Sequence, residues 1–349
     1  MLTAKENMRE VIKGGNPDRY VNQYEALSFC MHPFMFFNPS VKKGGPDIVD
    51  AWGVTRSWPA GVPGGFPVHT PDKVVIKDIE DWKEYVHAPN LKFDSKAWEM
   101  AEGMAAGIDR EKSFATAMVA PGLFENTHHL SGMDNALLYY MINEDEMKDL
   151  IKYLTDWELE MAEGICSHLH PDALLHHDDW GSEQNSFLRP EMFEDYFLDA
   201  YKQIYGYYHD HGVEFIIHHS DSYCANIVPI MIEMGIDVWQ GCMHSNYNPE
   251  LIKKYGGKMT FMGEIDNKFV DFPGWTPADC EKAARDAIAS CGQENKYFIP
   301  CITQGGPGST FPGTYKELTE AIYKINEEKF GWTREQQVEA APPMIVMFE

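Results

Sequence analysis

The sequence predicts an α/β protein built as a (β/α)8 TIM barrel with an elaborated amino-terminal segment. Its 349 residues are enough for one large α/β domain, and we expect a single domain over residues 1–349. From residue 113 onward, short apolar runs alternate with amphipathic helical segments. Polar and charged residues follow these runs, as they do at the carboxyl ends of barrel strands.

Regular strand–helix units are expected between residues 113 and 330. Short apolar runs predict the strands, and prolines, glycines and capping residues mark the helices between them. Alternation at this spacing predicts a parallel sheet with right-handed crossover connections. The six predicted strands cover residues 114–119, 173–177, 214–217, 238–243, 259–262 and 297–300.

Residues 1–112 are less regular and are expected to form amino-terminal helices and an irregular lid. Residues 20–27 and 73–79 are candidates for two more strands, which would bring the total to the eight of a closed barrel. The Gly/Pro-rich stretch at residues 39–71 predicts an elaborated loop or lid. A doubly wound sheet is the alternative, but the chain lacks the Gly-rich phosphate turn of that fold.

The composition is strongly acidic, with a net charge of −25 and a pI near 4.9. This argues against binding to nucleic acid or to an anionic membrane. We expect a cytoplasmic protein, since the sequence shows no secretory leader and no membrane-length apolar run. Seven cysteines without a Cys-x-x-Cys pair indicate reduced thiols. The apolar tail at residues 342–349 suits packing against a neighbouring surface. A homodimer is the assembly considered for this chain.

The segment from Glu214 to Ser222, Glu-Phe-Ile-Ile-His-His-Ser-Asp-Ser, changes from an apolar strand to imidazole and carboxylate groups. His219 and Asp221 would point to the same side of the strand, about 7 Å apart along the backbone. Both need a partner if they are buried. Cys301 follows a later strand, and nitrogen, oxygen and sulfur ligands together suit zinc with one open coordination place. A hydrogen-bonded structural pair and a buried thiol are the alternatives.

Other polar and aromatic residues at the strand ends are candidates for chemistry. Asp178 could act as a general base, and Glu264 as a proton carrier or a fourth metal ligand. His128 and His129 are expected to be loop histidines rather than ligands. The candidate substrate-binding residues are Asp179, Trp180, Tyr223 and Trp239.

These segments resemble the uroporphyrinogen decarboxylase superfamily, which includes zinc-dependent, corrinoid-linked methyltransferases. The resemblance spans nearly the whole chain and implies a (β/α)8 barrel. It is strongest over residues 134–330, in Asp178-Asp-Trp-Gly-Ser, Arg189-Pro-Glu-Met-Phe, His219-Ser-Asp, Met262-Gly-Glu-Ile-Asp and Pro300-Cys.

Two branches of this superfamily differ in their amino-terminal and metal-site residues. Decarboxylases carry an arginine-rich segment for the substrate's carboxylates, whereas residues 16–25 here contain a single arginine. The methyltransferases resemble each other in a His-x-Cys…Cys zinc site. His219 and Cys301 match its first and last ligands, and Asp221 replaces the middle cysteine. A carboxylate makes the site harder, which suits an oxygen leaving group better than a thiol.

The resemblance therefore implies a zinc-assisted methyltransferase that acts on a small donor, for example a methoxylated aromatic. The acceptor would be the cobalamin of a separate corrinoid protein, because this chain lacks the Asp-x-His-x-x-Gly segment that binds corrinoids. The Gly-rich segment at residues 305–313 would leave room for such a partner to dock. A tetrapyrrole decarboxylase and a non-catalytic corrinoid-docking protein remain the alternatives.

Overall fold

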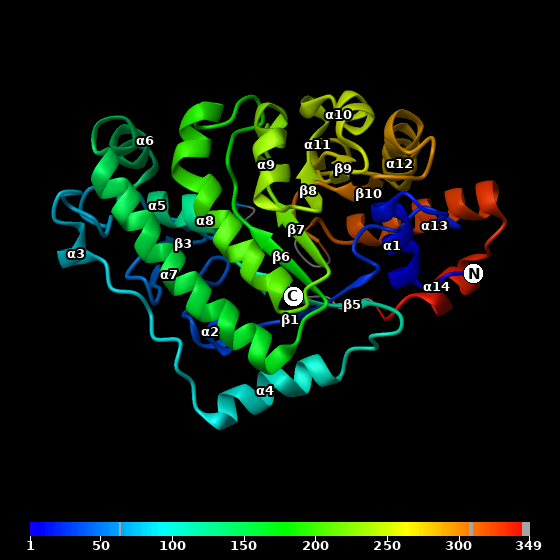
Figure 1. Cartoon of the computed structure of the whole chain (residues 1–349). Helices are drawn as coiled ribbons and strands as arrows, with labels where there is room; N and C mark the ends of the chain where they lie inside the picture. Colours follow the sequence, from blue (N-terminus) through cyan, green and yellow to red (C-terminus); the bar gives the residue numbers. More distant parts are fainter. Residues whose placement is uncertain (63, 307–309, 344–349) are drawn as a thin grey trace.

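Seven parallel strands form a curled sheet surrounded by helices, which is a TIM-like arrangement (Figure 1). The structure is a computed structural model and describes residues 1–62, 64–306 and 310–343. Neighbouring strands in the sheet follow the chain order, as right-handed crossovers produce. In that order the strands are β1 (Leu27–Cys30), β5 (Phe114–Val119), β6 (Ala173–His177), β7 (Phe215–His219), β8 (Val238–Cys242), β9 (Thr260–Ile265) and β10 (Phe298–Ile302).

All six strands predicted after residue 113 are confirmed, and three of them extend further than predicted. Strands β7, β9 and β10 each continue two or three residues past the predicted end, so that His219, Glu264 and Cys301 lie within strands. Every residue of these three strands is buried. Polar residues usually indicate the start of a loop in a sequence. Here they continue the strands, because their side chains are buried in the interior.

The two extra strands predicted in the amino-terminal segment are wrong in detail. Residues 20–26 do not form a strand, since Gln23 has a left-handed backbone with φ of 54° and the strand starts only at Leu27. Residues 73–79 form no strand either, because the N–H groups of Val75 and Ile76 donate to the carbonyl of Leu130. Within the described residues, β1 and β10 thus remain two edges that are not hydrogen-bonded to each other.

The predicted lid region contains a small antiparallel sheet of its own. Its three strands are β2 (Ile48–Val49), β3 (Thr55–Ser57) and β4 (Phe66–Pro67). The carboxylate of Asp50 organises the turn between β2 and β3, because it accepts hydrogen bonds from the N–H groups of Trp52 and Val54 and from the Arg56 side chain. This sheet carries Arg56 and Trp58 toward the barrel.

Helices cover the outside of the sheet and its amino-terminal end. Arg9 of the first helix binds Glu214, the residue before β7, through two hydrogen bonds of 2.8 Å. Helices α7 and α8 lie side by side (Figure 1). The helices are α1 (Ala4–Lys13), α2 (Pro33–Phe37), α3 (Trp82–Tyr85), α4 (Ser95–Ala106), α5 (Leu123–Ser131), α6 (Met133–Ile142), α7 (Glu144–Leu169), α8 (Pro190–Asp210), α9 (Val228–Met234), α10 (Asn248–Tyr255), α11 (Asn267–Val270), α12 (Pro277–Cys291), α13 (Thr314–Phe330) and α14 (Arg334–Ala340).

All seven cysteines are buried and free of disulfides, in line with the reduced thiols predicted from the sequence. No helix in the described part of the chain is long and apolar enough to cross a membrane. The apolar tail from residue 344 onward and residues 307–309 of the Gly-rich segment lie outside the described residues.

Candidate metal and substrate site

Two His-x-Asp segments meet at the carboxyl ends of neighbouring strands. His177 ends β6 and His219 ends β7, and the two residues are paired in the sheet. Their rings are stacked with centroids 4.4 Å apart and planes 19° apart. Asp179 and Asp221 each follow two residues after their histidine. Paired residues on adjacent strands face the same side, so the sheet brings both imidazoles and both carboxylates together.

The Nε2 atoms of both histidines face the carboxylates. Nε2 of His219 lies 3.7 Å from Oδ2 of Asp221 and 4.0 Å from Oδ1 of Asp179. Nε2 of His177 lies 3.9 Å from Oδ2 of Asp179. The ligand atoms of His177, Asp179 and His219 are all within 4.8 Å of one another. This spacing is compatible with one cation bound between them.

The Nδ1 atoms of both histidines are held by acceptors behind them. Nδ1 of His177 lies 2.8 Å from Oε2 of Glu125, and Nδ1 of His219 is hydrogen-bonded to Oε1 of Gln240. The amide nitrogen of Gln240 donates to the carbonyl of Ile302, which turns its oxygen toward His219. An imidazole that donates from Nδ1 presents a lone pair at Nε2. Metal-binding histidines are commonly oriented in this way.

The local charges favour a cation at this point. Burial opposes protonation of His177, but the carboxylates of Glu125 and Asp179 outweigh it and raise the pKa of His177 to about 10. Burial and the neighbouring Asp179 raise the pKa of Asp221 above its ordinary value. Three carboxylates therefore surround two imidazoles, and a divalent ion could take the place of the proton on His177.

A second group of possible ligands lies behind the first, but the placement of its protons makes it unsuited to a metal. Glu125, His128 and His129 place their ligand atoms within 4.8 Å of one another. However, Nη2 of Arg56 lies 3.2 Å from Nδ1 of His129. An arginine can only donate, so Nδ1 of His129 accepts and its Nε2 carries the proton. That N–H points toward Glu125, 4.0 Å away, and cannot bind a metal.

His128 and His129 are helical and buried, not loop residues as expected from the sequence. Burial lowers the pKa of His128 to about 3 and lowers that of His129 as well, so both are neutral. Their helix α5 also carries Glu125. We interpret this group as the support that positions Glu125 behind His177.

The structure does not bring Cys301 together with the other predicted metal ligands. The thiol is fully buried, which raises its pKa, and the amide nitrogen of Gln240 lies 4.0 Å from its sulfur. Gln240 also binds Nδ1 of His219, so this one amide contacts both the thiol and the histidine ring. Among the described residues, no cluster of three potential ligands within 4.8 Å includes Cys301.

Asp178 is placed differently from a solvent-accessible general base. Its carboxylate accepts hydrogen bonds from the N–H groups of Phe124 at 3.0 Å and Glu125 at 2.7 Å, from Trp180 Nε1 at 2.8 Å and from the Tyr201 hydroxyl. Burial raises the pKa of Asp178 to about 7. Through the two hydrogen bonds from backbone N–H groups, Asp178 fixes the amino-terminal end of α5 and thereby the position of Glu125.

The remaining predicted residues have other partners than the two histidines within the described part of the chain. Glu264 is hydrogen-bonded to His244 Nδ1 at 2.6 Å and to the Asn248 amide at 2.5 Å. Trp180 and Trp239 are fully buried in the core. Tyr223 is half-buried, and its backbone N–H donates to Ser182. None of the predicted residues Glu264, Trp180, Tyr223 and Trp239 is among the described residues that line the main cavity.

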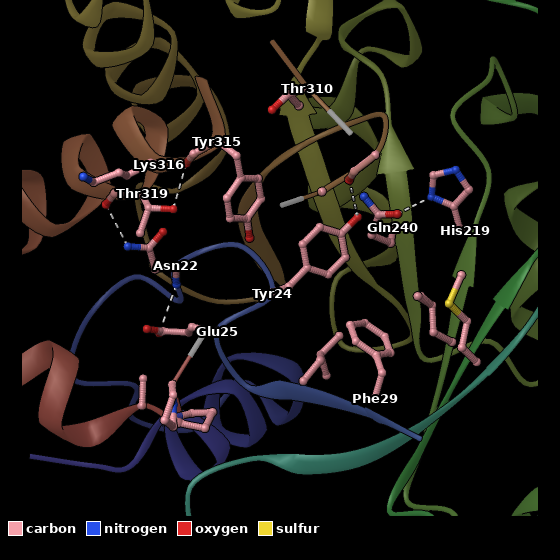
Figure 2. Close-up of a pocket in the computed structure, with 18 of the residues that line it drawn as sticks. Asn22, Tyr24, Glu25, Phe29, His219, Gln240, Thr310, Tyr315, Lys316 and Thr319 are labelled. Atoms are coloured by element: carbon pink, nitrogen blue, oxygen red, sulfur yellow. Dashed lines mark hydrogen bonds between the residues drawn. The ribbon is translucent and has the colours of Figure 1, made fainter. Parts of the chain in front are cut away.

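A cavity of about 1600 Å³ opens beside the two histidines. His177, His219 and Asp221 form part of its wall. Figure 2 shows His219 and Gln240 on one side of this cavity and Asn22 and Glu25 on the other. Apolar and aromatic side chains line the space between, including Tyr24, Leu27, Phe29, Met118 and Leu175.

Comparison with known proteins identifies the family. The sequence profile of the uroporphyrinogen decarboxylase (URO-D) family matches residues 59–325, which is well over half of the chain. The protein belongs to the uroporphyrinogen decarboxylase family. This confirms the resemblance inferred from the sequence. No curated protein matches the chain.

Among solved structures, a methyltransferase from Methanosarcina mazei is similar to this family member, with a TM-score of 0.66 and 12% identity. The match covers 94% of this chain and 99% of the other. A GH10 endo-β-1,4-xylanase from Gloeophyllum trabeum matches with a TM-score of 0.38 and 10% identity. That match covers 66% of this chain and 81% of the xylanase. A Cellulomonas fimi endo-β-1,4-mannanase double mutant matches with a TM-score of 0.41 and 10% identity. That match covers 94% of this chain and 74% of the mannanase. At these identities the similarity concerns the fold.

Proposed function

We propose that this family member is a methyltransferase that moves a methyl group from a small donor to the cobalamin of a separate corrinoid protein. The observation that carries the proposal is the orientation of His177 and His219, which line a large cavity and whose Nε2 atoms face the carboxylates of Asp179 and Asp221. The similarity of fold to a methyltransferase over nearly the whole chain supports it.

Zinc is the metal that this set of residues would suit. Two imidazole nitrogens and a carboxylate oxygen are typical of catalytic zinc, which keeps a coordination place for a reactant. We propose that His177, Asp179 and His219 hold the metal, with Asp221 as a further oxygen ligand. Cys301, the sulfur ligand predicted from sequence, is not among the residues proposed here, because its sulfur contacts Gln240 and belongs to no three-ligand cluster of the described residues. Bound zinc would supply Lewis acidity toward the leaving oxygen of the donor.

The cavity wall indicates how a donor could be held. Phe29, Met118 and Leu175 offer apolar surface beside the histidines, which would bind an aromatic ring and keep water away from its methyl group. Glu125 and Gln240 keep the Nδ1 protons of the two imidazoles in place during the reaction. A nitrogen–oxygen site of this kind suits a methyl ether, such as a methoxylated aromatic, better than a thiol.

The cavity is poorly suited to a substrate with many carboxylates, as a tetrapyrrole decarboxylase would require. Arg334 is the one arginine among its described lining residues, and Glu320 binds it through two hydrogen bonds of 2.6 Å. The described lining also carries four lysines, Lys42, Lys43, Lys112 and Lys316, and three carboxylates, from Glu25, Asp221 and Glu320. What speaks against the decarboxylase is therefore the lack of several arginines for paired binding of carboxylates.

The test measures methyl transfer to free cob(I)alamin. The absorbance change that accompanies the formation of methylcobalamin is the readout. Zinc-loaded protein with methoxylated aromatics as donors should form methylcobalamin, and His219→Ala should slow it by about 100-fold or more. Uroporphyrinogen turnover by metal-free protein would establish the decarboxylase instead. If no O-methyl donor is consumed with either free cobalamin or a corrinoid protein present, the proposal is wrong and a docking role is favoured.

A further inference from the structure

We infer that Arg56 is a positioning residue that couples the lid sheet, as we call strands β2, β3 and β4, to the metal site. It does so by fixing the proton of His129 on the nitrogen that faces Glu125. This coupling rests on the proposed function, because it concerns the metal at His177. Three contacts in series carry it, and they join Arg56, His129, Glu125 and His177.

The lid sheet holds the guanidinium of Arg56 in one position. Nε of Arg56 lies 2.7 Å from Oδ2 of Asp50, whose side chain is 1% exposed. The other carboxylate oxygen of Asp50 accepts from the N–H groups of Trp52 and Val54 at 3.0 Å each. Asp50 therefore joins Arg56 to the turn between β2 and β3, and Nη2 of Arg56 is left for a partner outside the lid sheet.

The partner outside the lid sheet is His129 of α5, whose neutral ring has one proton to place. Nη2 of Arg56 lies 3.2 Å from Nδ1 of His129. An arginine can only donate, so Nδ1 accepts and the proton is on Nε2. This Nε2 lies 4.0 Å from Oε1 of Glu125. Without Arg56 the proton could move to Nδ1, and the lone pair of Nε2 would then face the carboxylate.

Glu125 connects this contact to the metal site, because its two carboxylate oxygens have different partners. Oε1 faces His129, whereas Oε2 lies 2.8 Å from Nδ1 of His177. Loss of the favourable contact with His129 would let the carboxylate turn away from His177. The imidazole of His177 would then be held less firmly with its Nε2 toward the metal. Groups behind a metal-binding histidine change metal affinity by about 10–100-fold when they are mutated.

The coupling links the metal site to the cavity, because the lid region also lines the cavity. Trp58 directly follows β3, only two residues after Arg56, and it lies in the cavity wall. The position of the lid sheet over the cavity and the position of Glu125 thus depend on the same arginine. Coupling between two sites acts equally in both directions, so bound metal should in turn stabilise the lid sheet.

Zinc affinity, measured by competition with a chromophoric chelator, tests the role of Arg56. Arg56→Gln should bind zinc about tenfold more weakly than wild type, because the charged fork between Asp50 and His129 is lost. Lys73→Gln is the matched control, since it removes the exposed ion pair of Lys73 with Asp47, at 2.8 Å, elsewhere in the amino-terminal segment. Its zinc affinity should equal that of wild type.

Substitution of His129 separates a positioning role from simple packing. An amide carries an acceptor and a donor, so His129→Gln can accept from Arg56 and donate toward Glu125, and its zinc affinity should stay within about threefold of wild type. His129→Leu fills similar space with neither group, and it should lose about tenfold in affinity. If His129 served packing alone, both variants would have lower melting temperatures but the same zinc affinity.

Hydrogen exchange of the wild-type protein tests the same coupling from the lid sheet and needs no variant. Zinc should slow the exchange of the peptide that contains Trp52 and Val54, whose N–H groups bind Asp50. Normal zinc affinity in both Arg56→Gln and His129→Leu, or exchange that zinc does not change, would overturn the inference and leave the proposed metal site intact. Wild-type protein that binds no zinc would overturn both.

Discussion

At the scale of single residues, the site depends on which ring nitrogen of each histidine carries a proton. Glu125 and Gln240 accept from the Nδ1 atoms and leave both Nε2 atoms facing carboxylates. The same reasoning removes His129 from the possible ligands, because Arg56 donates to its Nδ1. The role of a histidine here therefore follows from the group behind it.

Asp178 provides a residue-scale prediction that separates a structural role from the catalytic one expected from the sequence. Its carboxylate accepts four hydrogen bonds, two of them from the N–H groups that start α5. Asp178→Asn would turn one acceptor into a donor, and we expect the free energy of unfolding to fall by about 3 kcal/mol. Urea denaturation measures this, with the exposed Asp199→Asn as control. Unchanged stability with lost activity would restore the catalytic role.

Part of the site could be predicted from the sequence, because a change from apolar to polar residues at the end of a strand is visible at individual positions. His219 and Asp221 were identified by the change from apolar to polar residues at the end of a strand, and the structure places them side by side. His177 carried the same signal, since His-Asp-Asp179 repeats the His-x-Asp pattern one strand earlier. Comparing successive strand ends would have revealed it. The position of Gln240 between His219 and Cys301 could not be predicted, because it depends on packing across three strands.

At the scale of elements, an irregularity within β8, at the point where β8 passes the end of β7, shapes the site. The pairing of β8 with β9 shifts between Gln240 and Cys242. Gly241 at this point has φ of 92°, and its Cα lies against the backbone of β7's end. A Cβ there would come within 2.9 Å of the carbonyl oxygen of Ser220. The irregularity turns Gln240 into the barrel behind His219 and needs a glycine.

Gly241→Ala should therefore be strongly destabilising. The added methyl group clashes with backbone, and the left-handed conformation is unfavourable for alanine, so we expect a loss of about 2–4 kcal/mol. Differential scanning calorimetry would show a lower melting temperature. Gly206→Ala is the matched control, because Gly206 lies in α8 with open space around its Cα and should be neutral or stabilising. Equal stability of both variants would contradict this account.

Periodicity predicted the six regular strands because each is bounded by turn residues and followed by a helix with clear ends. The amino-terminal part could not be predicted as well, since its segments are fixed by tertiary hydrogen bonds. Gln23 binds Thr319 of α13, and residues 75 and 76 bind the end of α5. Such partners, far away in the chain, do not show in local periodicity.

At the scale of the whole molecule, the acidic charge acts on stability more than on fold. A net charge of −25 produces repulsion throughout the chain that unfolding relieves. Salt screens this repulsion, with a Debye length of about 30 Å at 0.01 M and about 3 Å at 1 M. We expect the melting temperature at pH 7.5 to rise as NaCl increases from about 0.01 to 0.5 M. Near pH 4.9, where the net charge vanishes, the same salt should have little effect. A fall in melting temperature with salt at pH 7.5 would contradict the repulsion argument.

The central claim is that two successive strands each supply a His-x-Asp segment to one metal. Metal analysis of the purified protein by mass spectrometry tests it most directly, with His177→Ala, His219→Ala, Cys301→Ala and the exposed His211→Ala compared. The account predicts one zinc per chain in wild type, in Cys301→Ala and in His211→Ala, and loss of zinc in the other two variants. Zinc retained in His177→Ala but lost in Cys301→Ala, or no zinc in wild type, would contradict it.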